Sequence, residues 1–286
     1  MKKEEQKGGG DREAVYADFS KQVLTGSVTL GVRKVEEQAR QLKLDCSKLD
    51  IVEVKEDGSG KSLDWKVGEA GPCGAELTVT LPETKEDMSI TLSYSTSPSS
   101  SALQWLSPAQ AGGDHPYLFS QNQAIHCRAM VPCQDTPSVK VPYTATITVP
   151  SPLTALMSAL REGDPLSLPG GLTQYKFSQL VPIQSYLIAI AVGQLDSVRV
   201  GPRSLVWGGK KQLELAKVDF SETEEMLTTA ESLCGPYVWG DYDILVLPPS
   251  FPFGGMENPC LTFATPTLLS GDKSNANVIA HEMAHS

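Results

Sequence analysis

Two histidines and a glutamate stand at spacings that allow them to bind a metal ion and activate water. His281, Glu282 and His285 form the pattern H-E-x-x-H. On a helix, positions i and i+4 share one face, so both imidazoles can coordinate a single Zn²⁺. A bound zinc ion lowers the pKa of its water toward neutrality, and Glu282 is placed to accept the proton that this water loses. The pattern predicts a zinc hydrolase site, the alternative being an ordinary pair of surface or core histidines.

The position of this motif at the end of the sequence bears on the metal site. Catalytic zinc sites use three protein ligands and a water, and Ser286 is the last residue. The motif by itself offers two of these three protein ligands. The five-residue gap between Cys127 and Cys133 matches no common zinc motif, so this pair is not predicted to bind metal.

A loop of unusual composition precedes the metal motif. Gly254, Gly255, Met256 and Glu257 follow one another between two prolines, and Phe253 stands directly before them. Glycine permits unusual backbone conformations and proline restricts them, so together they can give a loop a defined shape. Such a loop, with a single carboxylate in it, is suited to lie close to a ligand. By itself the composition favours the simpler alternative of an ordinary turn.

Composition and charge exclude several classes of protein. The chain has 286 residues, 40% of them hydrophobic, which is enough for one large domain or two. Its formal net charge of −10 argues against a nucleic-acid surface, because phosphate binding depends on clustered Lys and Arg. The sequence predicts no secretory signal and no membrane span. The six cysteines are scattered, so we expect free thiols and a cytoplasmic location, and we further expect a monomer.

Alternation of apolar and polar residues predicts that the first two-thirds of the chain are β-structure. Such runs are typical of half-buried antiparallel strands, and the apolar run at 185–192 indicates a strand buried on both faces. Residues 1–14 are charged and glycine-rich, so we expect a flexible head. Residues 15–195 are therefore expected to form an antiparallel β-saddle or sandwich, with strands at 27–32, 49–54, 75–81, 88–94, 144–149 and 185–192.

Helical signals begin after residue 195. Ser221 and Glu224 have the spacing of a capping box, and a glycine supplies the stop, so a helix is predicted over 222–234. A short buried strand is predicted at 243–247. The last helix is expected to begin near Ser274, a residue type common at the N-cap, and it brings the two histidines of the metal motif to one face.

The glycine-rich loop and the metal motif together resemble a known family. Gly254 to Asn258 has the form G-x-M-E-N, and the gluzincin aminopeptidases couple such a loop to H-E-x-x-H. The resemblance covers about residues 17–286. Within that family the chain looks more like the leukotriene A4 hydrolase branch than like aminopeptidase B, on the runs Tyr117–Arg128, Pro132–Ser138, Gly235–Gly240 and Asn258–Thr267.

This resemblance implies a fold and a set of roles. It implies an N-terminal β-saddle domain over 15–195 and the start of a thermolysin-like α+β zinc peptidase domain over 196–286. His281 and His285 would be zinc ligands and Glu282 the general base. Glu257 and Gln123 would hold the α-ammonium group of a peptide, because a carboxylate and an amide oxygen suit such a cation. The same pocket would include backbone groups of Gly254, Gly255 and Met256, and it would be lined by Gln121, Ala124 and Phe253.

The implied activity is removal of N-terminal residues from peptides, with a second reaction on a fatty-acid epoxide. In the leukotriene A4 hydrolase branch the same zinc acts on leukotriene A4, in an apolar channel, to give leukotriene B4. The family's third zinc ligand, a glutamate, and its proton-donating tyrosine lie downstream of the second histidine. The resemblance therefore implies a C-terminally truncated chain that lacks the third protein ligand, holds Zn²⁺ weakly and is nearly inactive. Two alternatives stay open: an arginine-preferring aminopeptidase B type, which Phe253 favours, and a non-catalytic fragment that acts only by binding.

Overall fold

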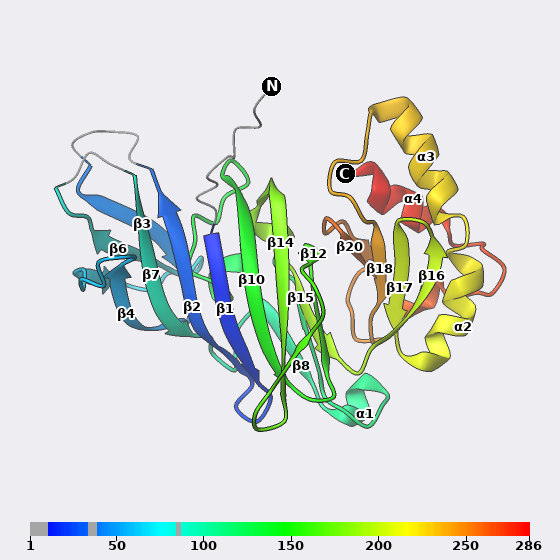
Figure 1. The fold of residues 1–286 in the computed structure, drawn as a ribbon, viewed down its shortest axis with the longest axis horizontal. Coiled ribbons are helices and arrows are strands. Elements are labelled where there is room, and N and C mark those ends of the chain that lie inside the picture. Colours follow the sequence, from blue (N-terminus) through cyan, green and yellow to red (C-terminus); the bar gives the residue numbers. More distant parts are fainter. Residues whose placement is uncertain (1–10, 34–38, 84–86) are drawn as a thin grey trace.

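Residues 11–33, 39–83 and 87–286 are described by a computed structural model of the chain. The fold is mainly β, as predicted, with a large N-terminal assembly of strands beside a smaller unit of strands and helices (Figure 1). The predicted flexible head is wrong for residues 11–14, because they lie in the first strand and pair with strands on both sides. The rest of that head, residues 1–10, lies outside the described residues.

An eight-stranded sheet forms the frame of the N-terminal assembly. Its order is β12-β14-β10-β1-β2-β7-β4, and β13 also pairs with β14. Side chains alternate between its faces, so in β10 Tyr143, Ala145 and Ile147 are buried while the residues between them are less so. The pairing is antiparallel, as predicted, except between β1 and β10, which run parallel. The strands are β1 (Asp11–Asp18), β2 (Val23–Val32), β4 (Asp50–Glu56), β7 (Met88–Ser95), β10 (Lys140–Pro150), β12 (Leu160–Arg161), β13 (Leu166–Leu168) and β14 (Leu172–Gln184).

Two smaller sheets complete this assembly. One has the order β3-β6-β5 and the other β11-β15-β9-β8. Strands predicted at 27–32, 49–54, 75–81, 88–94 and 144–149 coincide with β2, β4, β6, β7 and β10, with ends shifted by a few residues. The elements of these sheets and their connections are β3 (Gln41–Cys46), β5 (Trp65–Val67), β6 (Ala75–Thr80), β8 (Leu103–Leu106), α1 (Pro108–Ala111), β9 (Tyr117–Ser120), η1 (Cys127–Ala129), β11 (Thr154–Met157), η2 (Ser185–Leu187) and β15 (Ile190–Gly193).

The predicted strand at 185–192 is wrong in its first part. Residues 185–187 form the 3-10 turn η2, and the strand β15 begins only at Ile190. The polar groups of this segment bond to loops instead of a neighbouring strand. Ser185 Oγ donates to Asp135 Oδ1 at 2.7 Å, and the Ile188 carbonyl accepts from Asn122 Nδ2 at 2.6 Å. Apolar composition alone therefore did not distinguish a strand from a buried turn.

The smaller unit is a five-stranded sheet in the order β16-β17-β18-β20-β19, with helices on one face. Strand β18 is buried on both faces: Ile244 and Val246 pack with the helices, whereas Leu245 and Leu247 belong to the core shared with the N-terminal assembly. The predicted strand at 243–247 is thus confirmed. The elements are β16 (Asp196–Gly201), β17 (Ser204–Gly208), α2 (Lys210–Asp219), α3 (Thr223–Cys234), β18 (Asp243–Val246), β19 (Gly255–Met256), β20 (Leu261–Ala264), η3 (Pro266–Leu268) and α4 (Asn277–Ala284).

Helix α3 confirms the predicted helix at 222–234, but its capping box is wrong. Ser221 Oγ donates to the Val218 carbonyl at 2.8 Å, and Glu224 pairs with Arg203 at 2.9 Å, so neither side chain caps the helix. Helix α2 and strands β16 and β17 were not predicted. Within the described ranges, no helix is both long and apolar enough to cross a membrane.

Strand β1 carries two acidic residues on its inward face. Because side chains alternate, Asp11 and Glu13 point to the same side as the buried Val15. Glu13 is only 9% exposed, and its Oε1 accepts from the Tyr94 hydroxyl at 3.2 Å. Burial raises the pKa of Glu13 to about 7 and that of Asp11 to about 6. The folded chain therefore favours the protonated form of both carboxyls.

We expect the stability of the chain to fall as the pH rises through the pKa of Glu13. Protonation stabilises the fold fully below the ordinary value of 4.5 and this contribution is lost as the pH passes about 7. Ionisation of Glu13 should lower the free energy of unfolding by about 3 kcal/mol. Urea unfolding at about pH 5 and about pH 8 measures it. Glu13→Gln should flatten this dependence, whereas the exposed Glu69→Gln should leave it unchanged, and equal slopes in the two variants would contradict the assignment.

Candidate active site

Helix α4 places both histidines of the metal motif on one exposed face. The Nε2 atoms of His281 and His285 lie 3.4 Å apart, and their ring planes make an angle of 84°. Two nitrogens at about 2.0–2.1 Å from a tetrahedral zinc ion are themselves separated by about 3.4 Å. The imidazole pair therefore fits one zinc ion. Both side chains are exposed to solvent, so the metal side of the helix is open.

Glu282, directly after His281, is the buried member of the motif and packs against the glycine-rich loop. It is 5% exposed. A Cβ added to Gly255 would lie only 2.5 Å from the Glu282 carboxyl carbon, so glycine is required for this close approach. Burial and the nearby Glu257 raise the pKa of Glu282, and the two histidines lower it. A carboxylate whose pKa is shifted toward neutrality is better suited to accept and release a proton.

Glu257 connects the loop with both units of the molecule. It is half-buried, and its charge acts on Glu282 of α4 and on Tyr186 of η2. The next residue, Asn258, is buried, and its Nδ2 has no hydrogen-bond partner among the described residues. Glu257 therefore brings a second carboxylate near Glu282 of α4, on the side of the loop where Tyr186 also feels its charge. Two neighbouring carboxylates give a negative electrostatic potential that suits an ammonium group.

The N-terminal assembly contributes the loop after β9. Gln121 is half-buried, and its Nε2 lies 3.4 Å from the Met256 sulfur, so the structure brings these two predicted residues together. Gln123 and Ala124 lie further along the same loop, are exposed, and are joined by a cis peptide bond. Phe253 is 49% exposed. Gln121 and Met256 are therefore in contact, whereas Gln123 and Ala124 follow in the same loop on the exposed surface.

An aromatic cluster fixes the glycine-rich loop between the two units. The ring of Phe251 contacts Phe119 of β9 at 5.9 Å, Phe263 of β20 at 6.1 Å and Phe253 at 6.1 Å between centroids. All of these contacts are edge-to-face, the arrangement that aromatic quadrupoles favour. The loop is thus held by side chains from both the N-terminal assembly and the smaller sheet.

The N-terminus of α4 differs from the prediction. The helix begins at Asn277 with Ala276 as its N-cap, and Ser274 does not cap it. The Ser274 hydroxyl instead donates to Ser270 Oγ at 3.1 Å, within a loop that Asp219 organises. Asp219 is 1% exposed and accepts from the backbone N–H groups of Gly271 and Lys273, both at 2.9 Å. A buried carboxylate at the end of α2 therefore fixes the loop that leads into α4.

We expect Asp219→Asn to destabilise the chain by about 2 kcal/mol, because an amide nitrogen would face backbone N–H donors that need an acceptor. Glu222→Gln is the matched control. Glu222 reaches the same loop through an exposed ion pair with Lys273 at 2.7 Å, and such a pair contributes less than about 1 kcal/mol. Urea unfolding measures the free energy of unfolding of the two variants and the parent chain. Equal losses in the two variants would show that Asp219 does not anchor this loop.

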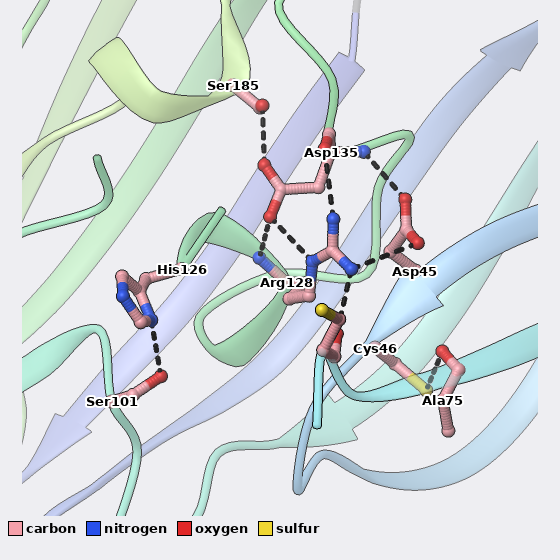
Figure 2. A network of polar contacts seen from close by, with 9 residues as sticks. Asp45, Cys46, Ala75, Ser101, His126, Arg128, Asp135 and Ser185 are labelled. Carbon is pink, nitrogen blue, oxygen red and sulfur yellow. Dashed lines mark hydrogen bonds and ion pairs between the residues drawn. The ribbon is translucent and has the colours of Figure 1, made fainter. Parts of the chain in front are cut away.

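A polar network beneath the β9 loop was not predicted. Figure 2 shows the Arg128 guanidinium between Asp135 and Asp45. Its Nε lies 2.9 Å from Asp135 Oδ2, and the Asp135 side chain is fully buried. Arg128 Nη1 also donates to the Cys73 carbonyl at 2.8 Å. Arg128 and Asp135 lie within runs that carry the family resemblance and Asp45 does not, and nothing in the spacing of the three residues indicated that they would meet.

Tyr186 was also missed. The sequence predicted it as part of a strand, whereas the turn η2 places it where the charge of Glu257 acts on it. Burial, and then Glu257, raise the pKa of its hydroxyl. No local sequence signal distinguishes this tyrosine from any other in an apolar run.

Comparisons with known proteins give a consistent family. The Peptidase M1 N-terminal domain profile matches residues 14–187, and the Peptidase family M1 domain profile matches residues 219–286. The chain is 50% identical over 279 residues to leukotriene A-4 hydrolase of Xenopus laevis and 46% identical over 273 residues to leucine aminopeptidase 2 of Yarrowia lipolytica. These matches cover 95% and 94% of this chain.

Solved structures agree. A structure of yeast LTA4 hydrolase in complex with bestatin superposes with a TM-score of 0.88 at 40% identity, covering 96% of this chain. Native leukotriene A4 hydrolase from Saccharomyces cerevisiae gives 0.89 at the same identity. The chain spans 45% of the frog relative, 41% of the Yarrowia relative and 43% of the yeast structures.

Proposed function

Because the chain belongs to the peptidase M1 family, we propose that residues 1–286 carry the metal-binding helix and the amine-recognition loop of a zinc aminopeptidase. Peptidase M1 is a zinc metallopeptidase family. The observation that carries the proposal is the close packing of Glu282 on Gly255. It joins the H-E-x-x-H helix to the G-x-M-E-N loop in one site, with the imidazole pair at a spacing that fits zinc.

In this proposal the side chains divide the reaction between them. His281 and His285 would hold the zinc ion, which would supply Lewis-acid activation of a water and of the substrate carbonyl. Glu282 would act as the general base and return the proton to the leaving amine. Glu257, with Gln123 from the loop after β9, would bind the free α-ammonium and so limit cleavage to the first residue. In this proposal α4 supplies the catalytic groups, and the glycine-rich loop and the loop after β9 recognise the N-terminus of the substrate.

A second reaction, hydrolysis of the epoxide leukotriene A4, is supported by the identity of 50% to a leukotriene A-4 hydrolase. The relative named leucine aminopeptidase 2 is almost as similar, at 46%, so the comparisons favour both activities. Phe253 favours a third candidate, an arginine-preferring aminopeptidase. A purely binding role for residues 1–286 is a fourth.

Activity toward different substrates distinguishes these candidate functions. The test enzyme is a chimera in which the C-terminal part of the Xenopus laevis relative follows residue 286. We expect it to hydrolyse leucyl-p-nitroanilide and not the N-acetylated compound, because the acetyl group removes the ammonium that Glu257 would bind. Preference for the arginyl substrate would favour the third candidate, and conversion of leukotriene A4 would support the second. A folded, zinc-loaded chimera without peptidase activity would contradict the proposal.

A polypeptide of residues 1–286 alone is expected to bind zinc weakly and to turn over peptides several powers of ten more slowly than the chimera. Catalytic zinc sites use three protein ligands and a water, and α4 supplies two imidazoles. Zinc titration with a competing chelator gives stoichiometry and affinity, and the same sample gives the peptidase rate. Tight one-to-one binding with ordinary turnover would require another ligand, for which Glu257 would be the first candidate.

A further inference from the structure

Two thiols in the N-terminal assembly lie close together, although the spacing of these cysteines matches no common motif. The Sγ atoms of Cys127 and Cys133 lie within 4.8 Å of each other, and an oxygen of Asp135 lies within the same distance of both. Both cysteines are free. Cys127 is completely buried, whereas Cys133 is half-buried. One member of the pair is therefore accessible and the other stands behind it.

A cavity leads to the accessible thiol. It has a volume of about 210 Å³ and lies between β1, β2, β3 and the segment 131–134. Its walls are mainly apolar, with Leu30, Leu42 and Val131 among them, and Cys133 lines it whereas Cys127 does not. This volume is many times that of one water molecule. A small uncharged oxidant can therefore reach Cys133 before it reaches Cys127.

Arg128 provides a fixed positive charge beside Cys133. The guanidinium is held by Asp135 and Asp45 (Figure 2), and it interacts electrostatically with the Cys133 thiol. The hydrogen bond with Cys133 and burial raise the pKa of Cys127, so the buried member of the pair stays in the thiol form. Cys133 is therefore the sulfur that a reagent in the cavity meets first.

The third nearby group does not make this cluster a metal site. Both oxygens of Asp135 are engaged, Oδ2 by Arg128 at 2.9 Å and Oδ1 by Ser185 Oγ at 2.7 Å. A divalent cation would have to displace these donors and would be repelled by the guanidinium. The geometry suits reaction between the two sulfurs.

We propose that Cys133 and Cys127 form a reversible redox site, in which Cys133 reacts with a hydroperoxide and Cys127 resolves the product as a disulfide. The Cys133 thiolate attacks one peroxide oxygen, the O–O bond breaks, and the sulfenic acid forms with release of water or an alcohol. The Cys127 sulfur then attacks the Cys133 sulfur, expelling the sulfenic oxygen as water. The two thiols are oxidised by two electrons and the peroxide is reduced by two.

This site differs in place and chemistry from the proposed peptidase site, yet it adjoins one of its loops. Cys127 begins η1, directly after the loop that carries Gln123 and Ala124. Cys133 is fixed to β3, since Asp45 and Cys133 exchange two backbone hydrogen bonds, at 2.8 and 3.3 Å. A disulfide requires the sulfurs to approach to about 2.05 Å. Oxidation would therefore draw η1 toward β3.

Peptide mapping of the oxidised chain tests the site without any activity assay. The 286-residue chain is treated with hydrogen peroxide, its remaining thiols are blocked with N-ethylmaleimide, and it is digested with trypsin. Cleavage after Arg128 and Lys140 places the cysteines in peptides 86–128 and 129–140. We expect these peptides to be joined with loss of two hydrogens, and dithiothreitol to separate them. The exposed Cys73 and Cys234 are replaced by serine in a parallel sample, which should give the same product.

A resolving role for Cys127 has its own signature. In Cys127→Ser the sulfenic acid of Cys133 cannot be resolved, so dimedone should label Cys133 at least about tenfold more than in the parent chain. Cys127→Ala serves as a second variant, and far-ultraviolet circular dichroism checks that each is folded. If both variants fail to fold, the map of the parent chain decides. Absence of the 86–128 to 129–140 product, a dominant link from Cys46 to Cys73, or no added dimedone label in folded variants would each overturn the proposal.

Discussion

Replacing the proposed base should reduce peptide hydrolysis by about a thousandfold without removing the metal. In the chimera with the frog C-terminal part, Glu282→Gln retains the size of the side chain but cannot accept a proton. His281 and His285 are the proposed zinc ligands, and both remain in this variant, so zinc should stay bound. The measurements are kcat for leucyl-p-nitroanilide and the zinc content of the dialysed protein.

His281→Ala is the comparison that separates the two roles. It removes one of the imidazoles that lie 3.4 Å apart, so both zinc and activity should be lost. Glu282→Gln with activity within a few fold of the parent chimera would show that another group takes the proton. Loss of zinc from Glu282→Gln would instead mean that this carboxylate supports the metal site.

The second large effect is expected at a glycine. Gly255→Ala should lower kcat by about a hundredfold, because displacement of a catalytic group by about 1 Å has consequences of this size. The added methyl group would collide with the Glu282 side chain, which has a buried position and little room to move. Zinc content should be unchanged. Steady-state kinetics of the chimera measure the effect.

The neighbouring glycine provides a matched control. A Cβ at Gly254 would meet nothing within 4 Å, although Gly254 belongs to the same motif. Gly254→Ala should therefore stay within a few fold of the parent. If the two alanine variants were equally impaired, the cause would be the flexibility of the loop and not the contact with Glu282.

Most strands were predictable because a strand buried on one face shows its period of two directly in the sequence. The runs at 75–81 and 88–94 correspond to β6 and β7 for this reason. The run at 185–192 carried no such period, and tertiary hydrogen bonds from Asn122 and to Asp135 determined its shape. The parallel pairing of β1 with β10 joins segments far apart in the chain, and no local pattern could indicate it.

The candidate site, too, was only partly predictable from the sequence. The spacing of His281 and His285 depends only on helical geometry, and α4 brings them together as that spacing requires. The start of α4 was misplaced because Asp219, a distant residue, organises the preceding loop. The role of Gly255 depends on its contact with Glu282, which lies later in the sequence and in α4. The roles assigned to Glu257, Gln123 and Ala124 stay predictions.

The joint construction of the pocket has an evolutionary consequence. Gln121 meets Met256, and Phe119 meets Phe251, across the boundary between the two units. A recombination event that exchanged the N-terminal assembly alone would replace both partners at once and leave Met256 and Phe251 facing unfamiliar side chains. We therefore expect the two units to have been inherited together, with compensating substitutions in these four positions wherever one of them changed.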